Sequence, residues 1–106
     1  MTSKKPAKQK RAKQPRSNDK TKQFNKDWER LSHSGRYDMN RLKEAMMLLI
    51  ANDEPLPPEY LDHPLTGEWN GFRECHIGGD FLLIYELRAD GTIIFTSTGT
   101  HSELFD

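Results

Sequence analysis

Four side chains in the second half of the chain carry groups that can move protons: His63, His76, Asp80 and His101. Histidine is the side chain best suited to proton transfer near neutral pH, because its unperturbed pKa is about 6.5. Three histidines and one carboxylate would together supply a general base, a general acid and an orienting partner. The sequence therefore favours acid–base chemistry, provided that the fold brings these residues together.

Each histidine also has a structural interpretation. His63 could cap the turn before Pro64, His76 could be a surface residue of a strand, and His101 could be a polar residue of the C-terminal segment. A metal site is a further alternative, because imidazole and carboxylate groups are acceptable zinc ligands. The chain has neither an HxxxH nor a CxxC pattern. We therefore expect no metal and no other cofactor.

The 106-residue chain has a formal net charge of zero, but its charges are unevenly distributed. Residues 1–22 hold nine lysines or arginines and one aspartate, whereas the other 84 residues hold seven basic and fifteen acidic ones. We expect residues 1–20 to form a disordered basic tail and residues 21–106 to form one small domain. The tail either keeps the chain soluble or attracts phosphates.

Several protein classes are excluded by composition. No apolar stretch is long enough to span a membrane, and the basic N-terminal segment lacks the apolar core of a secretory signal. The single cysteine, Cys75, cannot form an internal disulfide, which is typical of a reducing compartment. These features predict a cytoplasmic protein without membrane contact.

Apolar periodicity predicts two helices followed by strands. Phe24, Trp28 and Leu31 recur at helical spacing, Gly35 favours the end of that helix, and a second apolar stripe begins at Met39. Strand patterns separated by glycine turns then cover residues 68–77, 81–87 and 92–97. The expected fold class is α+β, with an N-terminal helical hairpin packed on a small antiparallel sheet of three strands.

The turn at residues 78–79 decides how the first two strands pair. With a two-residue loop, His76 faces Phe81 and Asp80 pairs with Ile77. A three-residue loop or a bulge would place Asp80 beside His76 instead. The sequence therefore predicts His76 and Phe81 as neighbours and leaves the position of Asp80 open.

Four sequence blocks resemble one family of bacterial proteins. They occur in order, with matching gaps, at residues 62–65, 67–77, 80–85 and 98–105. They resemble the YafQ-like branch of the RelE/ParE toxins of type II toxin–antitoxin systems. The likeness extends from about Thr21 to the C-terminus, which is roughly four-fifths of the chain.

The resemblance implies an mRNA endoribonuclease that cuts messages in the ribosomal decoding site, uses no metal and is neutralised by an antitoxin protein. The implied reaction is attack of the ribose 2′-hydroxyl on the adjacent phosphate, with the 5′-oxygen as leaving group. The family's catalytic positions fall on His63, His76, Asp80 and His101. The implied partners are therefore an antitoxin, the ribosome and mRNA.

The resemblance also implies RNA-binding residues. Phe81 and Phe105 fall on the family's aromatic positions, where they would hold or stack a base. Arg73 is a candidate phosphate contact, because a guanidinium group matches phosphate geometry. An ion pair between Arg73 and a residue such as Glu86 is the alternative.

Two features depart from the family's pattern. These toxins usually begin with a short apolar strand, whereas residues 16–20 contain no apolar side chain, so that strand is either a weak edge or missing. The folded domain is acidic here and usually basic in the family.

The alternatives are a non-catalytic, ParE-like inhibitor of DNA gyrase, a ribosome-independent ribonuclease, and a chain that only binds an antitoxin. The three histidines argue against the ParE-like alternative.

Overall fold

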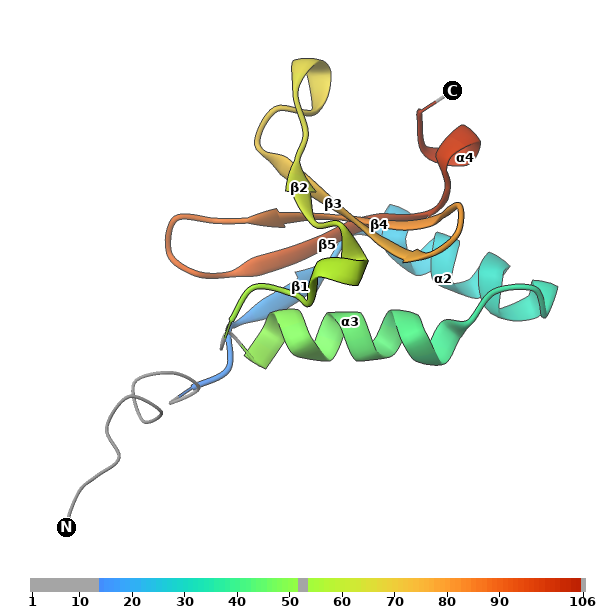
Figure 1. The fold of residues 1–106 in the computed structure, drawn as a ribbon, viewed down its shortest axis with the longest axis horizontal. Coiled ribbons are helices and arrows are strands. Elements are labelled where there is room, and N and C mark those ends of the chain that lie inside the picture. Colours follow the sequence, from blue (N-terminus) through green and yellow to red (C-terminus); the bar gives the residue numbers. More distant parts are fainter. Residues whose placement is uncertain (1–13, 52–53, 106) are drawn as a thin grey trace, which may run out of the picture.

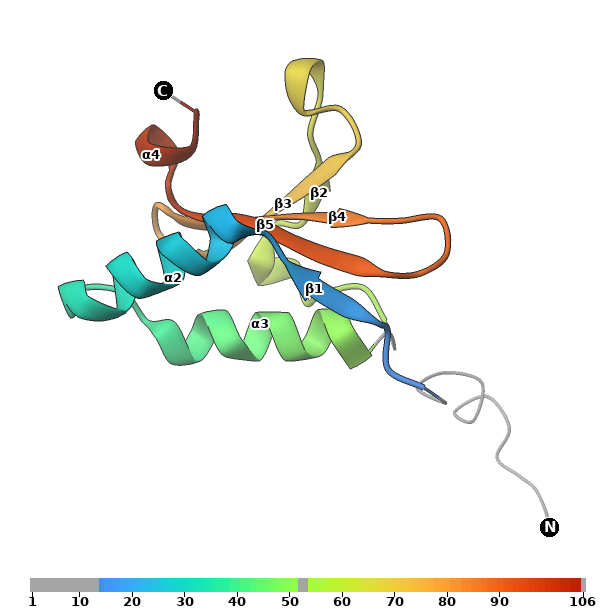
Figure 2. The same cartoon turned by 180° about the vertical axis from the view of Figure 1, so that it is seen from behind.

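The structure, a computed structural model, describes residues 14–51 and 54–105. Figures 1 and 2 show helices α2 and α3 on one face of a sheet, with α4 and the segment between β2 and β3 rising from the other face. Within the described ranges, no helix is long and apolar enough to cross a bilayer. The elements are β1 (Asn18–Lys20), α2 (Lys22–Ser34), α3 (Met39–Ala51), η1 (Pro58–Tyr60), β2 (His63–Pro64), η2 (Gly67–Trp69), β3 (Phe72–Gly78), β4 (Phe81–Leu87), β5 (Ile93–Thr100) and α4 (His101–Phe105).

The α+β fold class is confirmed, but the sheet has five strands rather than three. Their order is β1-β5-β4-β3-β2, and every pair is antiparallel except β1 with β5. The two additional strands are the edges. β1 is exposed throughout, so it is held by backbone pairing, as a weak edge. Ordered structure thus begins before residue 21, whereas residues 1–13 of the expected tail lie outside the described residues.

Local chemistry fixes the ends of α2. The Thr21 hydroxyl accepts a hydrogen bond from the Phe24 N–H at 2.9 Å and donates one to the Thr96 carbonyl at 2.7 Å. This residue therefore caps the helix and also attaches it to β5. The helix ends at Gly35, whose φ of 73° lies in the left-handed region that glycine adopts without strain.

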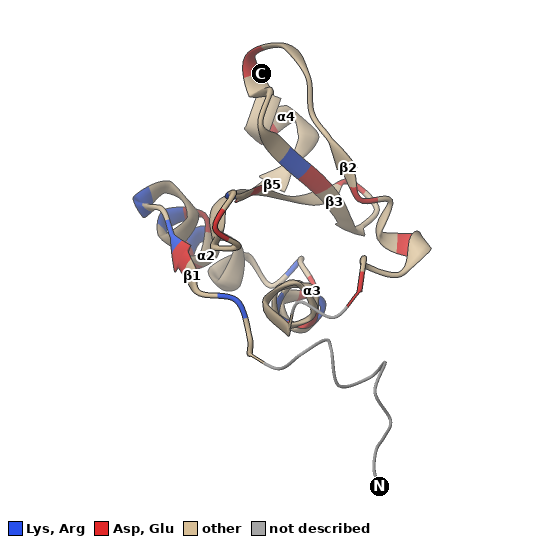
Figure 3. Ribbon diagram, turned by 90° about the vertical axis from the view of Figure 1, so that its left-hand side faces the viewer, with Lys and Arg blue, Asp and Glu red and all other residues tan. Residues whose placement is uncertain are grey.

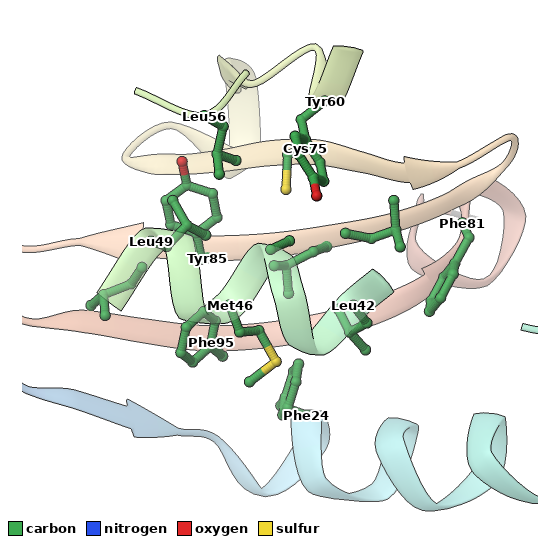
Figure 4. Packing of buried hydrophobic residues seen from close by; sticks show 14 of the residues in the cluster. Phe24, Leu42, Met46, Leu49, Leu56, Tyr60, Cys75, Phe81, Tyr85 and Phe95 are labelled. Atoms are coloured by element: carbon green, nitrogen blue, oxygen red, sulfur yellow. The ribbon is translucent and has the colours of Figure 1, made fainter. Parts of the chain in front are cut away.

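The core lies between the two long helices and the sheet, as Figure 4 shows. Each large apolar side chain buried there contributes roughly 1.5–3 kcal/mol. Asp27 is a buried charged residue at its border, and it accepts hydrogen bonds from the Thr98 N–H and from Gln23. The apolar core residues labelled in Figure 4 are Phe24, Leu42, Met46, Leu49, Leu56, Tyr60, Cys75, Phe81, Tyr85 and Phe95.

The hairpin between β3 and β4 differs from the expected one. Gly78 pairs with Phe81 and His76 pairs with Leu82, with a register shift between His76 and Gly78. The prediction that His76 faces Phe81 is therefore wrong by one residue. The extra residue, Ile77, is a bulge whose side chain remains in the core and whose carbonyl accepts a hydrogen bond from Arg41 Nε. β3 also begins later than expected, because Gly67–Trp69 forms a 3₁₀ turn.

Candidate active site

The sheet face opposite the helices carries His63 and His76, and we call it the histidine face. Side chains alternate along a strand, so His76 points away from its neighbours Cys75 and Ile77, which lie in the core. The cross-strand pairs His63–Glu74 and His76–Leu82 place these residues on the same face. Trp69 and Phe105 connect its two borders, since their rings lie 5.4 Å apart across the gap from η2 to α4.

The four predicted catalytic residues form two pairs. The rings of His63 and His76 have centroids 6.3 Å apart. Asp80, in the β3–β4 turn, accepts a hydrogen bond from the backbone N–H of His101 at 3.1 Å. Asp80 thus fixes the start of α4 and is not beside His76 in the strand ladder. Leu82 lies between the pairs, because it is flanked by His76 on β3 and by Gly99 on β5.

Both ring nitrogens of His63 are engaged. Nδ1 lies 2.7 Å from the Leu61 carbonyl, and Nε2 lies 3.0 Å from Oε1 of Glu74. A carbonyl only accepts, so Nδ1 must carry a proton. Nε2 and the carboxyl of Glu74 must then share a second proton, because two lone pairs would otherwise face each other. His63 is therefore a hydrogen-bond donor or a cation and has no free nitrogen to act as a base.

Glu74 is buried and is not among the residues predicted from the sequence. Its Oε2 atom has no hydrogen-bond partner among the described residues. The cost of burying this carboxyl group is therefore offset only at Oε1, by the proton shared with His63. The signal was available, because Glu74 is two residues from His76 and so lies on the same face of a strand. By contrast, within the described chain the imidazoles of His76 and His101 make no hydrogen bond and are available to a substrate.

A reciprocal pair of hydrogen bonds begins α4. The Thr100 N–H donates to Oε1 of Glu103 at 2.8 Å, and the Glu103 N–H donates to the Thr100 hydroxyl at 3.2 Å. Arg30 lies 3.5 Å from the same Glu103 oxygen. A Cβ atom at Gly99 would come within 2.6 Å of this carboxylate, so glycine permits the cap. The arrangement positions His101, the first residue of α4.

An aromatic chain leads from His101 to the sheet. Phe105 lies 4.9 Å from the His101 ring, and Trp69 contacts both Phe105 and Phe72 edge-on. Such contacts stabilise by about 0.5–1.5 kcal/mol each beyond area burial. Phe105 therefore lies beside His101, and its contact with an RNA base stays a prediction. Trp69 is not among the residues predicted from the sequence, because its local sequence looks like that of a strand residue.

Arg73 and Phe81 lie away from the histidine face. Arg73 Nε is 3.3 Å from Asp62, which also accepts hydrogen bonds from Tyr85 at 2.9 and 2.7 Å. Arg73 is thus in an ion pair, but with Asp62, whereas Glu86 pairs with Arg88. Figure 3 shows neighbouring blue and red segments on β3. Successive side chains of a strand point to opposite faces, so these two opposite charges lie on different sides of the sheet.

Phe81 belongs to the core. It is 4% exposed, and its ring lies 5.0 Å from that of Tyr37. The ring is therefore largely covered, although Phe81 is one of the residues that line the cavity at the end of the β3–β4 hairpin. Its contact with an RNA base stays a prediction.

Burial shifts several pKa values next to this site. Burial raises the pKa of the Cys75 thiol well above its ordinary value, and the nearby Asp62 and Glu74 raise it further. Burial also raises the pKa of Tyr85, assisted by its hydrogen bond to Asp62. Burial alone would lower the pKa of Arg73, but Asp62 and Tyr85 outweigh it, so the pKa is raised. These groups keep fixed protonation states at neutral pH and are unsuited to proton transfer.

The described residues contain no group of three or more histidine, cysteine or acidic side chains arranged to hold a metal ion. His63 lies near both Glu74 and His76, but its Nε2 is joined to Glu74. The arrangement is suited to acid–base chemistry with the imidazoles of His76 and His101 as the free groups.

Comparison with known proteins identifies the family of the chain. Residues 16–106 match the family described as the bacterial toxin of type II toxin–antitoxin system, YafQ. The chain is 48% identical over 83 residues to the mRNA interferase toxin YafQ of Escherichia coli strain K12, which covers 78% of this chain and 88% of that relative.

Solved structures give the same result. The crystal structure of YafQ from E. coli strain BL21(DE3) superposes with a TM-score of 0.78 at 44% identity, over 86% of this chain and 99% of that one. YafQ in the E. coli DinJ–YafQ toxin–antitoxin complex gives a TM-score of 0.77 at 44% identity, over 88% of this chain and 100% of that one. The family expected from the sequence is confirmed: the chain belongs to the YafQ family of toxins of type II toxin–antitoxin systems.

Proposed function

We propose that this chain is an mRNA interferase that cleaves messages on the ribosome without a metal ion. The observation that carries the proposal is that two imidazoles form no hydrogen bond within the described chain: that of His76, beside the fixed His63–Glu74 pair, and that of His101, at the start of α4. The name of the E. coli relative, mRNA interferase toxin, supports the same activity. Ribosome dependence rests on the family resemblance and is tested below.

The reaction needs one base and one acid. The base removes the proton of a ribose 2′-hydroxyl, and the oxygen then attacks the adjacent phosphorus. The bond to the 5′-oxygen breaks, and that oxygen takes a proton from the acid. The products are a 2′,3′-cyclic phosphate and a 5′-hydroxyl, so no water, metal or other reactant is consumed in this step.

We assign these roles from the hydrogen bonds. His76 and His101 transfer the two protons, because neither imidazole has another partner in the described chain. Both nitrogens of His63 are already engaged, so its role is to stabilise the charge of the phosphate through the proton that it shares with Glu74. Asp80 keeps His101 in place through the backbone, and Phe105 holds a base beside it.

The proposed partners are a cognate antitoxin protein, the ribosome and mRNA in the cytoplasm. The complex of DinJ with the E. coli relative supports an antitoxin partner. The remaining domain is acidic, so the nine basic residues in positions 1–22 would supply attraction to ribosomal RNA. Such attraction carries no sequence preference and weakens with salt.

The test is primer extension on messages from cells that express the chain or its His76→Gln variant. The proposal expects cuts in translated message that are lost in the variant. General acid–base catalysis contributes about 10²- to 10⁴-fold to a rate, so the loss should be of that order. His33→Gln is the matched control, because His33 lies in the last turn of α2, in the helical layer.

Purified chain is then incubated with free RNA and with RNA in translating ribosomes. Cleavage in both would make the enzyme ribosome-independent. A double variant combines His76→Gln with His101→Gln. If it still arrests growth without cutting RNA, the catalytic proposal is wrong and the chain acts as a binding inhibitor.

A further inference from the structure

A cavity of about 730 Å³ lies at the end of the β3–β4 hairpin and borders the candidate site. The α2–α3 turn and η1 form its other walls. His76 and Asp80 are among its lining residues, so the cavity is continuous with the proposed site of cleavage. We call it the Tyr37 pocket, because the ring of Tyr37 forms part of its wall.

Tyr37 offers a less buried aromatic surface than Phe81 does. Phe81 is buried, and its ring supports Tyr37 from the core side at 5.0 Å. Tyr37 is only partly buried, and the guanidinium of Arg36 lies 5.8 Å from its ring centroid. Tyrosine rings and guanidinium planes are both surfaces on which unpaired RNA bases stack.

The charged side chains of the pocket decide where a phosphate could bind. Arg36 is exposed and forms no ion pair within the described part of the chain. The second guanidinium, that of Arg41, lies 4.6 Å from the Tyr60 ring centroid and is bound to the Ile77 carbonyl. Arg36 is therefore the cation that is free to meet a phosphate.

Three carboxylates also line the pocket, and each has a defined place. Asp38 accepts from the Arg41 N–H at the start of α3, and Asp80 accepts from the His101 N–H. Glu59 forms no hydrogen bond or ion pair with the described residues. Carboxylates repel phosphate but accept from ribose hydroxyls and base amino groups. They would thus direct the sugar and base inward and leave the phosphate to Arg36.

We propose that the Tyr37 pocket binds one nucleotide of the message next to the cleaved bond, with its base against Tyr37 and its phosphate on Arg36. This inference rests on the proposed function, because it takes RNA as the substrate. The base-stacking role expected of Phe81 is thereby assigned to Tyr37, whose ring lies against that of Phe81 and is less buried. Tyr37 and Arg36 then contribute to RNA binding and not to proton transfer.

The experiment measures binding of a 2′-O-methyl RNA trinucleotide to the full chain by ¹H–¹⁵N NMR titration. This probe lacks the attacking hydroxyl and cannot be cleaved by the proposed reaction. Amide shifts should cluster at Tyr37 and at the 78–80 turn. Tyr37→Ala should raise Kd by roughly five- to a hundredfold, the range for losing one stacked base. Tyr37→Phe, which retains the ring, should bind within about twofold of the parent.

Arg36→Gln provides a second variant that does not touch the core. It should weaken binding and reduce the slope of log Kd against log salt by about 0.7, the value for one single-strand phosphate contact. Arg88→Gln is the matched control, because it removes an exposed arginine at the far end of β4. Unchanged binding in both Tyr37→Ala and Arg36→Gln overturns the pocket proposal.

Failure of the pocket can be told from failure of the proposed function. If messages are cut and His76→Gln abolishes the cuts, while the Tyr37 and Arg36 variants bind the probe normally, only the pocket proposal is wrong. If no message is cut but Tyr37→Ala loses the probe, the pocket binds RNA and the catalytic proposal is wrong.

Discussion

Nε2 of His63 lies 3.0 Å from Oε1 of Glu74, a carboxyl group that is almost completely buried. The other nitrogen of the ring is bound to the Leu61 carbonyl, so one proton must lie between the imidazole and the carboxyl group. A two-bond ¹H–¹⁵N spectrum distinguishes a doubly protonated ring from a neutral one. Because Glu74 contacts the histidine and not the open face, it is a positioning residue.

Glu74→Gln tests whether this proton matters. Glutamine can donate to Nε2 of a neutral His63, so the fold should be retained while the ring loses its charge-assisted bond. That bond contributes about 1.5–3 kcal/mol, so kcat should fall by about ten- to a hundredfold with little change in KM. Glu86→Gln, on the next strand, is the control. Full kcat in Glu74→Gln with a neutral His63 would show that the pair only joins β2 to β3.

Trp69→Ala tests the aromatic chain that supports α4. Removing the ring abolishes its contacts with Phe72 and Phe105, each of about 0.5–1.5 kcal/mol. We expect faster amide exchange in α4 and a loss of up to about tenfold in cleavage rate. Trp28→Ala is the comparison, because this second tryptophan packs against the core on α2. It should lower stability and leave exchange in α4 unchanged; the opposite pattern contradicts the positioning role.

The buried thiol of Cys75 predicts how stability depends on alkaline pH. Its pKa is raised from an ordinary 9.0, chiefly by burial, so the folded protein keeps a proton that the unfolded chain loses above pH 9. The folded state then binds more protons, and the free energy of unfolding falls as pH rises. The expected decrease is up to about 1.4 kcal/mol per pH unit above 9.

Urea titrations of the parent and of Cys75→Ala at several pH values between 8 and 10 measure this effect. The variant is less stable throughout because of the cavity, so the comparison concerns the slopes alone. Tyr85 has a higher ordinary pKa of 10.0 and is present in both chains. Equal slopes would mean that the thiol ionises as easily in the folded protein as in the unfolded one.

The sequence predicts the features that follow from short periodicities. The helical stripe of Phe24, Trp28 and Leu31 appears as α2, and alternation along β3 places His76 away from the core. Residues 81–85 are apolar throughout, so alternation does not show which of them face the helices. The structure turns Phe81 into the core and Leu82 to the histidine face, which is why the expected base-stacking ring is covered.

Other features depend on pairings that no local pattern encodes. The bulge at Ile77 shifts the hairpin by one residue, and a side chain from α3, Arg41, holds its carbonyl. β1 has no apolar residue, so only the free edge of β5 explains why it forms a strand. The spacing from His76 shows that Glu74 lies on the same face of β3. The proton that Glu74 shares depends on the ring of His63, which belongs to a different strand, β2.

Arg73 could contact RNA or form a structural ion pair, and the two roles predict different effects on stability. Its guanidinium lies 3.3 Å from Asp62, which is largely buried, on the side of β3 away from His76. Arg73→Gln should therefore lower the free energy of unfolding by about 1–3 kcal/mol, because Asp62 is left with Tyr85 alone. Asp62→Asn should destabilise to a similar degree, and the double variant should cost less than the two single changes added together.

RNA binding by the same Arg73→Gln variant then decides the residue's role. With the ion pair as its function, Kd for the trinucleotide and the salt slope should equal those of the parent at temperatures where both proteins are folded. A phosphate contact would instead reduce the slope by about 0.7 and leave stability nearly unchanged, as expected of Arg36→Gln. Because the two roles predict opposite results in two measurements, a weaker RNA complex of normal stability would restore the function implied by the family resemblance.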